Sequence, residues 1–361
     1  MADLAAVFRA GAEEYLGLYG GRMLPSHIRA VRDIARCRSP EMEHGGIYEC
    51  CGKKHYSYHS CGNRNCPKCG NDKVTRWLDG KLAERLPVEH FLVTFTLPAG
   101  LRGLCRSEQR TVFDAFFRAS SEALSELALD PRFVGGSPGM AGFLQTWRRD
   151  LGWHPHIHYI VPGGGISPDG KRWIHPRNKN FLVHGSPLAE LFRGKFMSEM
   201  KDAGLIGRTD PAVWEGKWIV DCCSAGDGAG AYRYLAAYTQ RTAVTDSRLE
   251  DLSDGNVTYR YTESATKTVR RKTIPVLAFM ALFLQHVLPK GLVRTRYYGF
   301  MAPAAKCTLR KLLVLMIRAR SSPPQENMTR RKSGPACPCC GKAMALTGSW
   351  YNARGPPKEK S

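Results

Sequence analysis

The stretch that decides the fold is residues 139–162, which read GMAGFLQTWRRDLGWHPHIHYIVP. Residues 139–147 predict one β-strand, and residues 154–162 predict the strand that returns beside it after a short turn. Upstream, residues 89–98, EHFLVTFTLP, predict a further strand that ends at a proline. Residues 107–128 carry apolar side chains at helical spacing and predict a helix. The segment therefore combines strands with a helix, and its last two strands run antiparallel.

Three histidines share one face of the returning strand. Because alternate side chains of a strand point the same way, His154, His156 and His158 lie together on one side. Three imidazoles on an otherwise apolar strand are costly as packing, and the pattern favours a divalent ion bound by at least two of them. Gln145 is the best-placed polar side chain of the opposing strand, and an amide oxygen suits Mg²⁺ or Mn²⁺. The alternative is a set of packed core histidines.

Two tyrosines are spaced four residues apart in a predicted helix. Residues 231–244, AYRYLAAYTQRTAV, follow a glycine-rich segment, and on a helix Tyr234 and Tyr238 lie about one turn, roughly 6 Å, apart on one face. Such a pair more often serves packing, and the spacing alone leaves that alternative open. Beside a cation that holds a phosphate, however, a tyrosine hydroxyl can attack a phosphodiester. The resulting 5′-phosphotyrosine link would keep the energy of the broken bond for rejoining.

Six cysteines fall between residues 37 and 69. The segment SCGNRNCPKCG at 60–70 contains a C-x2-C knuckle, in which a tight turn aims two thiolates at one ion. Zinc prefers four sulfur or nitrogen ligands in a tetrahedron. The predicted Zn²⁺ ligands are Cys51, Cys61, Cys66 and Cys69, with Cys37 next in line. The pattern leaves open a second site and the alternative of buried free thiols.

A second knuckle, CPCCG, lies at residues 337–341. No partner pair follows it, so it either borrows ligands from elsewhere in the chain or binds nothing. The N-terminal residues lack the order of a signal peptide, which predicts a reducing compartment, the cytoplasm. There, short cysteine spacings favour metal sites over disulfides.

The order of these motifs resembles a known family. SCGNRNCPKC is followed by TW…HPHIHYIVPGGG, then YLAAYTQR, then HVLPKGLVRTRYYGF. This arrangement resembles the HUH endonuclease superfamily and, within it, the two-tyrosine rolling-circle transposases of the insertion sequence 91 and common-region group. The resemblance covers roughly residues 30–305, and the combination is specific although each short motif alone is weak.

The resemblance implies an α+β fold with a ferredoxin-like antiparallel-sheet HUH nuclease core. It also implies Mg²⁺ or Mn²⁺ on His156 and His158, with Gln145 as a third ligand, and single-stranded DNA as substrate. By the same motif match, Tyr234 and Tyr238 are the nucleophiles. In the zinc segment, the adjacent Cys50 and Cys51 depart from a simple pattern, which leaves the exact ligand ambiguous.

Charge points to the same kind of partner. The chain has 53 Lys and Arg against 32 Asp and Glu, a formal net charge of +21, which favours a polyanion such as nucleic acid over a merely soluble basic surface. Residues 264–325 contain 12 Lys or Arg and no acid. Basic side chains mixed with aromatic rings suit single-stranded DNA. The predicted DNA-binding residues are Arg64, Lys68, Arg270, Arg271, Lys272, Arg294, Arg296, Tyr297 and Tyr298.

Four consecutive segments are expected. They are an N-terminal helix and zinc-binding domain (1–85), the HUH nuclease with the two-tyrosine helix (86–246), a basic, mainly helical DNA-binding region (247–325) and a flexible tail with the second knuckle (326–361). No run of about 18 apolar residues predicts a membrane span. No G-x4-G-K-[S/T] phosphate loop is present, so strand unwinding would need a host helicase.

The predicted function is a transposase associated with the nucleoid. It would nick single-stranded DNA at the ends of its element and transfer strands by rolling-circle transposition. One alternative is a replication initiator or relaxase-type nickase. Another is a non-catalytic, zinc-containing DNA-binding regulator, which would leave the histidine strand and the tyrosine pair unexplained.

Overall fold

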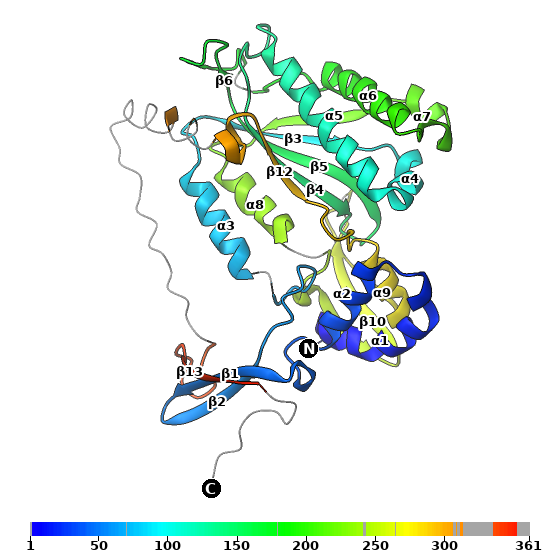
Figure 1. Ribbon diagram of the computed structural model, residues 1–361, viewed down its shortest axis with the longest axis vertical. Coiled ribbons are helices and arrows are strands. Elements are labelled where there is room, and N and C mark those ends of the chain that lie inside the picture. The colour runs from blue at the N-terminus through cyan, green and yellow to red at the C-terminus, as the bar shows by residue number, and fades with distance from the viewer. Residues whose placement is uncertain are drawn as a thin grey trace. The chain divides into compact units, whose positions relative to one another are not determined.

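The computed structural model describes residues 2–69, 71–178, 180–240, 243–263, 265–305, 308, 311–312 and 335–351 (Figure 1). The fold is mixed α and β with antiparallel sheets. The chain divides into two compact units. The first unit contains residues 1–72, 241–287 and 325–361, and the second contains residues 73–240 and 288–324. Segments far apart in sequence thus share a unit, which differs from the four consecutive segments predicted.

A five-stranded antiparallel sheet forms the centre of the second unit. The strands are β3 (His90–Thr96), β4 (Met140–Trp147), β5 (Trp153–Pro162), β8 (Ile219–Ser224) and β12 (Thr295–Tyr298), in the order β12-β4-β5-β3-β8. The predicted strand, turn and returning strand are β4 and β5. Every residue of β4 is buried, which explains its largely apolar sequence, because both faces of the sheet are covered.

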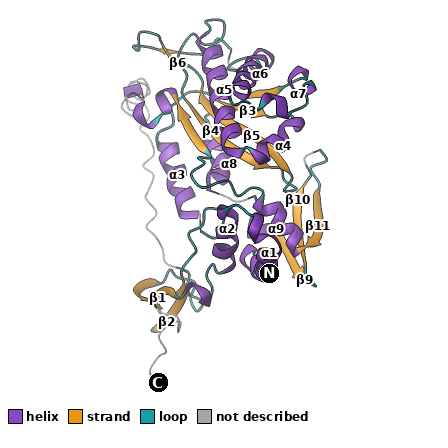
Figure 2. Cartoon of the chain, turned by 45° about the vertical axis from the view of Figure 1, so that its right-hand side comes forward, coloured by secondary structure: helices purple, strands orange, loops and turns teal. Residues whose placement is uncertain are grey.

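Helices cover both faces of this sheet (Figures 1 and 2). The α-helices that cover it include α3 (Asn71–Ala83), α4 (Arg102–Ser107), α5 (Gln109–Leu129), α6 (Gly185–Asp202), α7 (Ala212–Glu215) and α8 (Ala229–Gln240). One face packs on α5 and α6 through buried side chains that include Phe95, Phe116 and Phe192. Each such ring contributes about 1.5–3 kcal/mol on burial. The opposite face packs on α3 and α8 around Phe143, Ile160 and Leu235.

The first unit contains a helical layer built from two segments that lie far apart in the sequence. Helices α1 (Leu4–Tyr19) and α2 (Pro25–Ala35) pack with α9 (Val276–Leu284). The rings of Phe8 and Phe283 meet edge to face at 5.3 Å. A side chain added at Gly11 would fall 2.6 Å from Val276, so this crossing requires a residue without one. These contacts explain why residues 241–287 fold with the N-terminal helices.

The same unit contains two small antiparallel sheets. In one, β9 (Leu249–Ser253), β10 (Asn256–Thr262) and β11 (Val269–Pro275) pair in the order β11-β10-β9. In the other, β1 (His44–Cys50) lies between β2 (Lys53–Tyr58) and β13 (Ala345–Tyr351). Trp350 is buried there against Tyr56 and Tyr58. A two-stranded ribbon, β6 (Gly165–Ile166) with β7 (Trp173–Ile174), belongs to the second unit.

The region from residue 247 contains more strand than its sequence indicated. Three strands precede α9, and β12 follows it, whereas the sequence predicted a mainly helical region. Residues 308–319 lie almost wholly outside the described residues. Among the residues that the structure places, no helix is long and apolar enough to cross a membrane.

Candidate functional site

Three neighbouring strands place polar side chains on one face of the large sheet. The register pairs Gln145 of β4 with His156 of β5, and Thr94 of β3 with His158 of β5. Paired residues of adjacent strands lie on the same face. The rings of His156 and His158 are 4.7 Å apart between centroids. This is the face that α3 and α8 cover, so the site lies between the sheet and a helix.

Hydrogen bonds fix the orientation of both rings. His156 Nδ1 lies 2.8 Å from the carbonyl oxygen of His154. Because a carbonyl only accepts, Nδ1 carries the proton and Nε2 keeps its lone pair, the state that a metal ligand needs. His158 Nδ1 lies 2.9 Å from the hydroxyl of Thr94. Thr94 was not predicted, although its place in the alternating pattern of residues 89–98 carried the signal.

Burial keeps these imidazoles neutral. Desolvation lowers the pKa of His156 to about 4 and the pKa of His158 to about 3. His154 differs, because its Nδ1 lies 3.3 Å from Arg102 Nη2, and burial together with that guanidinium lowers its pKa. A bound cation would meet a positive charge at His154. Of the three predicted histidines, His156 and His158 therefore suit a cation better than His154.

Gln145 offers an amide oxygen to the same face. Its Nε2 donates to the carbonyl oxygen of Trp147 at 2.8 Å. Its Oε1 is buried and has no hydrogen-bond partner among the described residues. The register of β4 shifts between Gln145 and Trp147, a bulge that changes the direction of the side chain. An orphan buried oxygen beside two neutral imidazoles fits the donor set of Mg²⁺ or Mn²⁺.

Helix α8 brings a tyrosine to the histidines. The ring of Tyr234 lies 6.2 Å from that of His158, edge to face, and the side chain is 48% exposed. Tyr232 is 1% exposed and packs under the helix, in line with its position on a different helix face. Tyr238 lies in the last turns of α8, but its side chain is outside the described residues.

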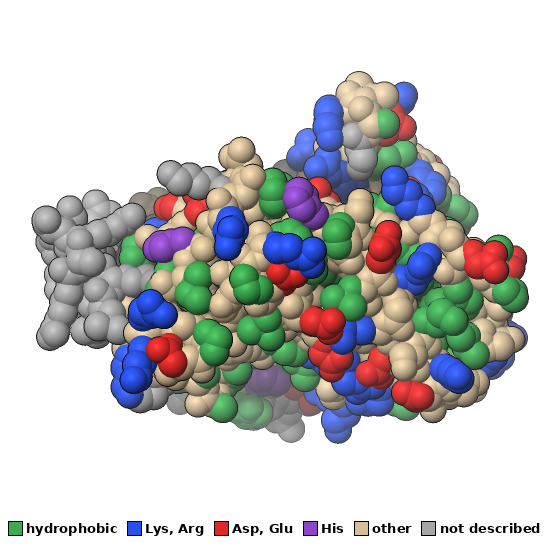
Figure 3. All heavy atoms as spheres, turned by 90° about the horizontal axis from the view of Figure 1, so that it is seen from above, with side chains coloured by type: hydrophobic (Ala, Val, Ile, Leu, Met, Phe, Trp, Pro, Cys, Tyr) green, Lys and Arg blue, Asp and Glu red, His purple; other side chains and the backbone are tan. Residues whose placement is uncertain are grey.

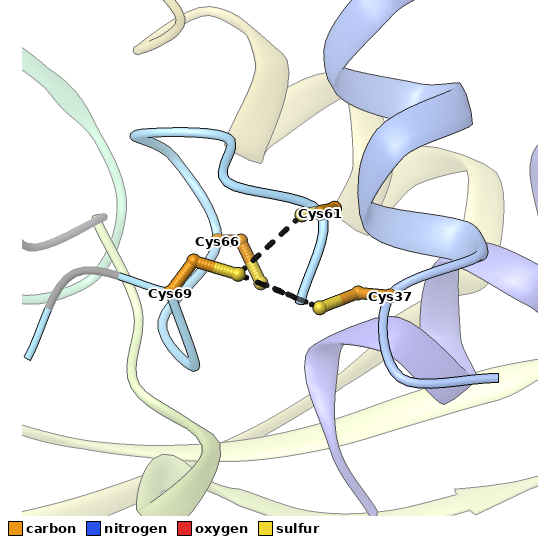
Figure 4. Close-up of side chains that lie close together, drawn as sticks. All are labelled: Cys37, Cys61, Cys66 and Cys69. Carbon is orange, nitrogen blue, oxygen red and sulfur yellow. Dashed lines mark hydrogen bonds between the residues drawn. The ribbon is translucent and has the colours of Figure 1, made fainter. Parts of the chain in front are cut away.

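Four cysteine sulfurs gather in the first unit, from Cys37, Cys61, Cys66 and Cys69 (Figure 4). Cys69 Sγ is 3.5 Å from the sulfurs of Cys37 and Cys61, and Cys66 Sγ is 3.6 Å from that of Cys37. A tetrahedral zinc with Zn–S bonds of about 2.3 Å places its sulfurs about 3.8 Å apart. Hydrogen bonds with the thiols of Cys61 and Cys66 lower the pKa of Cys37 to about 7, whereas the hydrogen bond with Cys69 and burial raise it. The group fits Zn²⁺.

Cys51 is not in this group, although the sequence placed it there. It occupies the turn between β1 and β2, whereas Cys37 follows α2 directly and reaches the knuckle. Cys51 instead lies with Cys50 and the distant knuckle residues Cys337 and Cys340. The hairpin geometry explains the difference, because its turn extends away from the strand ends that lead to residues 37 and 61.

Backbone hydrogen bonds hold the turn of the knuckle at residues 337–341. Gly341 N donates to the carbonyl oxygen of Cys337 at 2.8 Å, and Cys337 N donates to that of Lys342 at 2.7 Å. Backbone N–H groups of Cys339 and then Cys340 lower the pKa of Cys337 to about 6. The turn therefore presents a thiolate-stabilising geometry.

The predicted DNA-binding residues have diverse surroundings. Arg64 is exposed, while Lys68 forms an ion pair with Asp3. On the exposed strand β11, Arg270 pairs with Glu263, Arg271 pairs with Glu250, and Lys272 is exposed.

Strand β12 and Arg294, the residue before it, hold the other predicted DNA-binding side chains within the packing of the second unit. Arg294 is 7% exposed and lies over the ring of Trp147. Arg296 is ion-paired with Asp114, and the Tyr297 hydroxyl accepts a hydrogen bond from Trp77. Tyr298 is half-buried against Tyr159. These four side chains differ from the expected open stacking surface.

Acidic and basic side chains are mixed on the face of α5 and α6. Arg118 pairs with Glu199, and Lys195 pairs with Glu126. Figure 3 shows Lys and Arg side chains lying among Asp and Glu side chains on the face it views. That mixture is typical of a solvated surface and offers no uniform basic path for a phosphate backbone.

Comparisons with known proteins give the family. A family model described as a putative transposase matches residues 139–308, and one described as a transposase zinc-binding domain matches residues 7–97. The putative transposase y4qJ of Sinorhizobium fredii is 30% identical over 393 residues, which cover 99% of this chain and 97% of that protein. The transposase for insertion sequence element IS801 of Pseudomonas savastanoi pv. phaseolicola is 26% identical over 270 residues, covering 70% of this chain and 64% of that protein.

No solved structure matches the chain. The zinc-binding match includes all of Cys37, Cys61, Cys66 and Cys69, and the second match includes Gln145, the histidine strand and α8. With a relative that is similar over almost the whole of both chains, these matches show that the chain belongs to the insertion sequence 91 family of transposases, whose substrate is DNA.

Proposed function

We propose that this transposase nicks single-stranded DNA at the ends of its element, with Tyr234 and Tyr238 as nucleophiles. In this proposal His156, His158 and Gln145 hold Mg²⁺ or Mn²⁺. The observation that carries the proposal is the placement of Tyr234 on α8 beside His158, on the same face as the buried oxygen of Gln145. The proposed nucleophile and the proposed cation ligands thus lie on the same side of the sheet.

The chemistry is a transfer of one phosphodiester bond. The tyrosine oxygen forms a bond to phosphorus, and the bond from phosphorus to the 3′ oxygen of the neighbouring nucleotide breaks. The phenolic proton leaves to solvent, and the departing 3′ oxygen takes up a proton from solvent. The product is a 5′-phosphotyrosine and a free 3′ hydroxyl, so rejoining needs no outside energy source. When bound, the cation would neutralise charge on the scissile phosphate. Neutral His156 and His158 provide nitrogen ligands without a proton to displace at Nε2 of His156.

Other parts of the chain support the same activity. We assign Zn²⁺ of the N-terminal domain to Cys37, Cys61, Cys66 and Cys69, and DNA contacts to the exposed strand β11. Single strands would come from a host helicase, and the nucleoid of the bacterial cell is the expected place of action. The family match favours a transposase over a replication initiator and over a regulator without catalysis.

The test is a covalent-adduct assay. The full chain is incubated with labelled single-stranded DNA from an element end and with Mg²⁺ or Mn²⁺, then separated on a denaturing gel. We expect a protein–DNA band that requires the cation. The Tyr234→Phe/Tyr238→Phe double variant is expected to lose it, whereas Tyr232→Phe, which alters a buried ring on the same helix, keeps it.

Histidine variants separate binding from cutting. His156→Ala is expected to abolish the adduct while DNA binding, measured by fluorescence anisotropy, stays near the wild-type level. His154→Ala, on the same strand beside Arg102, is the matched control and keeps most of the adduct. A missing band with the wild-type chain, or an unchanged band in the double tyrosine variant, contradicts the proposal.

A further inference from the structure

The turn of the β1–β2 hairpin and the second knuckle lie at the same end of one sheet. Strand β13 runs antiparallel to β1, and the register pairs Glu49 with Ala345. Residues just after Glu49 therefore lie near residues just before Ala345. The first are Cys50 and Cys51, and the second contain the knuckle at residues 337–341. The sheet thus brings together two pairs of cysteines that lie almost 290 positions apart in the sequence, as the contact of Cys50 with Cys340 shows.

The turn conformation directs two adjacent thiols to one side. In an extended strand, neighbouring side chains point to opposite faces. Here Cys51 has φ +54° and Gly52 has φ +71°, the left-handed pair of a tight two-residue turn. A cysteine is uncommon at such a position, where Asn, Asp or Gly is usual. With this backbone, the sulfurs of Cys50 and Cys51 lie 3.7 Å apart.

The knuckle completes a group of four sulfurs. Gly341, with φ +71°, allows the tight turn between Cys337 and Cys340. The sulfurs of Cys50, Cys51, Cys337 and Cys340 all lie within 4.8 Å of one another, and those of Cys50 and Cys340 are 3.5 Å apart. These separations are close to the sulfur edge of a zinc tetrathiolate, about 3.8 Å.

We propose that Cys50, Cys51, Cys337 and Cys340 bind a second Zn²⁺, independent of the ion assigned to Cys37, Cys61, Cys66 and Cys69. Four thiolates fill a tetrahedral zinc and leave no position for water or substrate, so the ion is structural. It cross-links the β1–β2 turn to the segment that leads into β13. Neither family match extends to the knuckle, since they end at residues 97 and 308.

One neighbouring histidine provides a competing ligand set. His55 Nε2 lies 3.8 Å from Cys337 Sγ, and the ligand atoms of His55, Cys337 and Cys339 also lie within 4.8 Å of one another. This set has only three ligands, whereas the four cysteines by themselves supply all four ligands of a tetrahedral zinc. Cys339 and Cys340 are adjacent and both exposed, which makes them a matched pair of positions for substitution.

The experiment counts zinc in the full chain. The protein is purified under reducing conditions, and zinc per chain is measured by elemental mass spectrometry against amino-acid analysis. We expect two Zn²⁺ in the wild type and in Cys339→Ser, and one in Cys340→Ser. Cys66→Ser is expected to retain one, held by the second group, and the Cys66→Ser/Cys340→Ser variant none. Far-ultraviolet circular dichroism checks that each variant is folded.

A measurement on the wild type needs no variant. The chain stripped of zinc is titrated with Co²⁺, and two equivalents are expected to develop thiolate-to-cobalt absorption of tetrahedral type. One equivalent in that titration, or two zinc ions retained in Cys340→Ser, overturns the proposal. Loss of an ion in Cys339→Ser with retention in Cys340→Ser assigns the site to the His55 set instead. A Cys50–Cys340 disulfide in non-reduced peptides also overturns it.

Discussion

The rings of His158 and Tyr234 meet edge to face, with 6.2 Å between their centroids and 79° between their planes. Strand β5 supplies the imidazole and helix α8 supplies the phenol, so the seating of α8 on the sheet sets the distance between them. The buried side chains of Tyr232 and Leu235 attach the helix to the sheet. Packing under α8 therefore affects both stability and the geometry of the site.

Leu235→Ala tests this relationship. The side chain is fully buried, and its truncation leaves a cavity that costs about 2–5 kcal/mol of unfolding free energy. We expect a lower urea midpoint together with less covalent adduct at a temperature where the variant is still folded. Arg233→Ala, at an exposed position of the same helix, is the control and changes neither. If Leu235→Ala lowers stability but keeps full nicking activity, the packing of α8 on the sheet does not control catalysis.

Gln145 provides a test of the cation set. Gln145→Ala removes the buried amide oxygen, and we expect the Mn²⁺ concentration for half-maximal nicking to rise by about 10–100-fold. Gln145→Glu keeps an oxygen at the same position and adds negative charge, so it is expected to restore metal binding. The measurement is a Mn²⁺ titration of adduct formation, with DNA affinity followed in parallel. Equal Mn²⁺ dependence in both variants would exclude Gln145 as a ligand.

His90 makes stability depend on pH. Burial, opposed by a hydrogen bond from its Nδ1 to the carbonyl oxygen of Val88, lowers its pKa from 6.5 to about 4. Arg85 further lowers that pKa, while Asp227 and Glu89 raise it. Between these pH values the unfolded chain binds a proton that the folded chain does not. The free energy of unfolding is therefore unaffected by the titration of His90 above pH 6.5, and protonation of the unfolded chain lowers it by about 3 kcal/mol as the pH approaches 4.

The His90→Asn variant isolates that contribution. Asn keeps a donor for Val88 but does not titrate. We expect the free energy of unfolding in urea to fall more between pH 7 and pH 5 for the wild type than for the variant. Parallel pH profiles for the two proteins would show that His90 is not the source.

Gly45 is a position where the β1–β2–β13 sheet has no room for a side chain. A Cβ there would fall 2.2 Å from the ring of Trp350 and 2.4 Å from the carbonyl oxygen of Ser57. Gly45→Ala is expected to destabilise the sheet by about 1–3 kcal/mol and to expose residues 335–351 to limited proteolysis. Gly348→Ala, whose Cβ would be 3.4 Å from Ile47, is the matched control. Equal protease resistance in both variants would contradict this account.

Strand β11 is predicted to contact the DNA backbone. Lys272→Ala is expected to weaken binding of a single-stranded oligonucleotide and to reduce the slope of log affinity against log salt by about 0.7, the value for one phosphate contact. Fluorescence anisotropy over a series of salt concentrations gives that slope. Arg118→Ala, which removes a charge paired with Glu199, should leave it unchanged. If the slope of log affinity against log salt for Lys272→Ala equals that of the wild type, Lys272 does not contact a phosphate.

The sequence predicted the parts of the site that depend on local periodicity. Alternation along residues 154–162 placed His156 and His158 on one face, and the pairing of β4 with β5 brought Gln145 opposite His156. It did not predict the partners of Cys51, because these depend on a strand, β13, that lies far away in the sequence. It also did not predict how Arg294 and Arg296 pack, because that packing depends on the pairing of β12 with β4, which no local pattern records. Their role as DNA contacts stays a prediction.

The central position of β1 has a consequence for synthesis of the protein. The backbone N–H and C=O groups of β1 pair with β2 on one side and with β13 on the other. Strand β13 leaves the ribosome only after the nuclease strands and α8. Until then one edge of β1 stays open to other chains, the arrangement that favours association between nascent polypeptides. A transposase interrupted before residue 345 keeps this open edge. The β1–β2–β13 sheet can therefore be completed only after β13 has been synthesised.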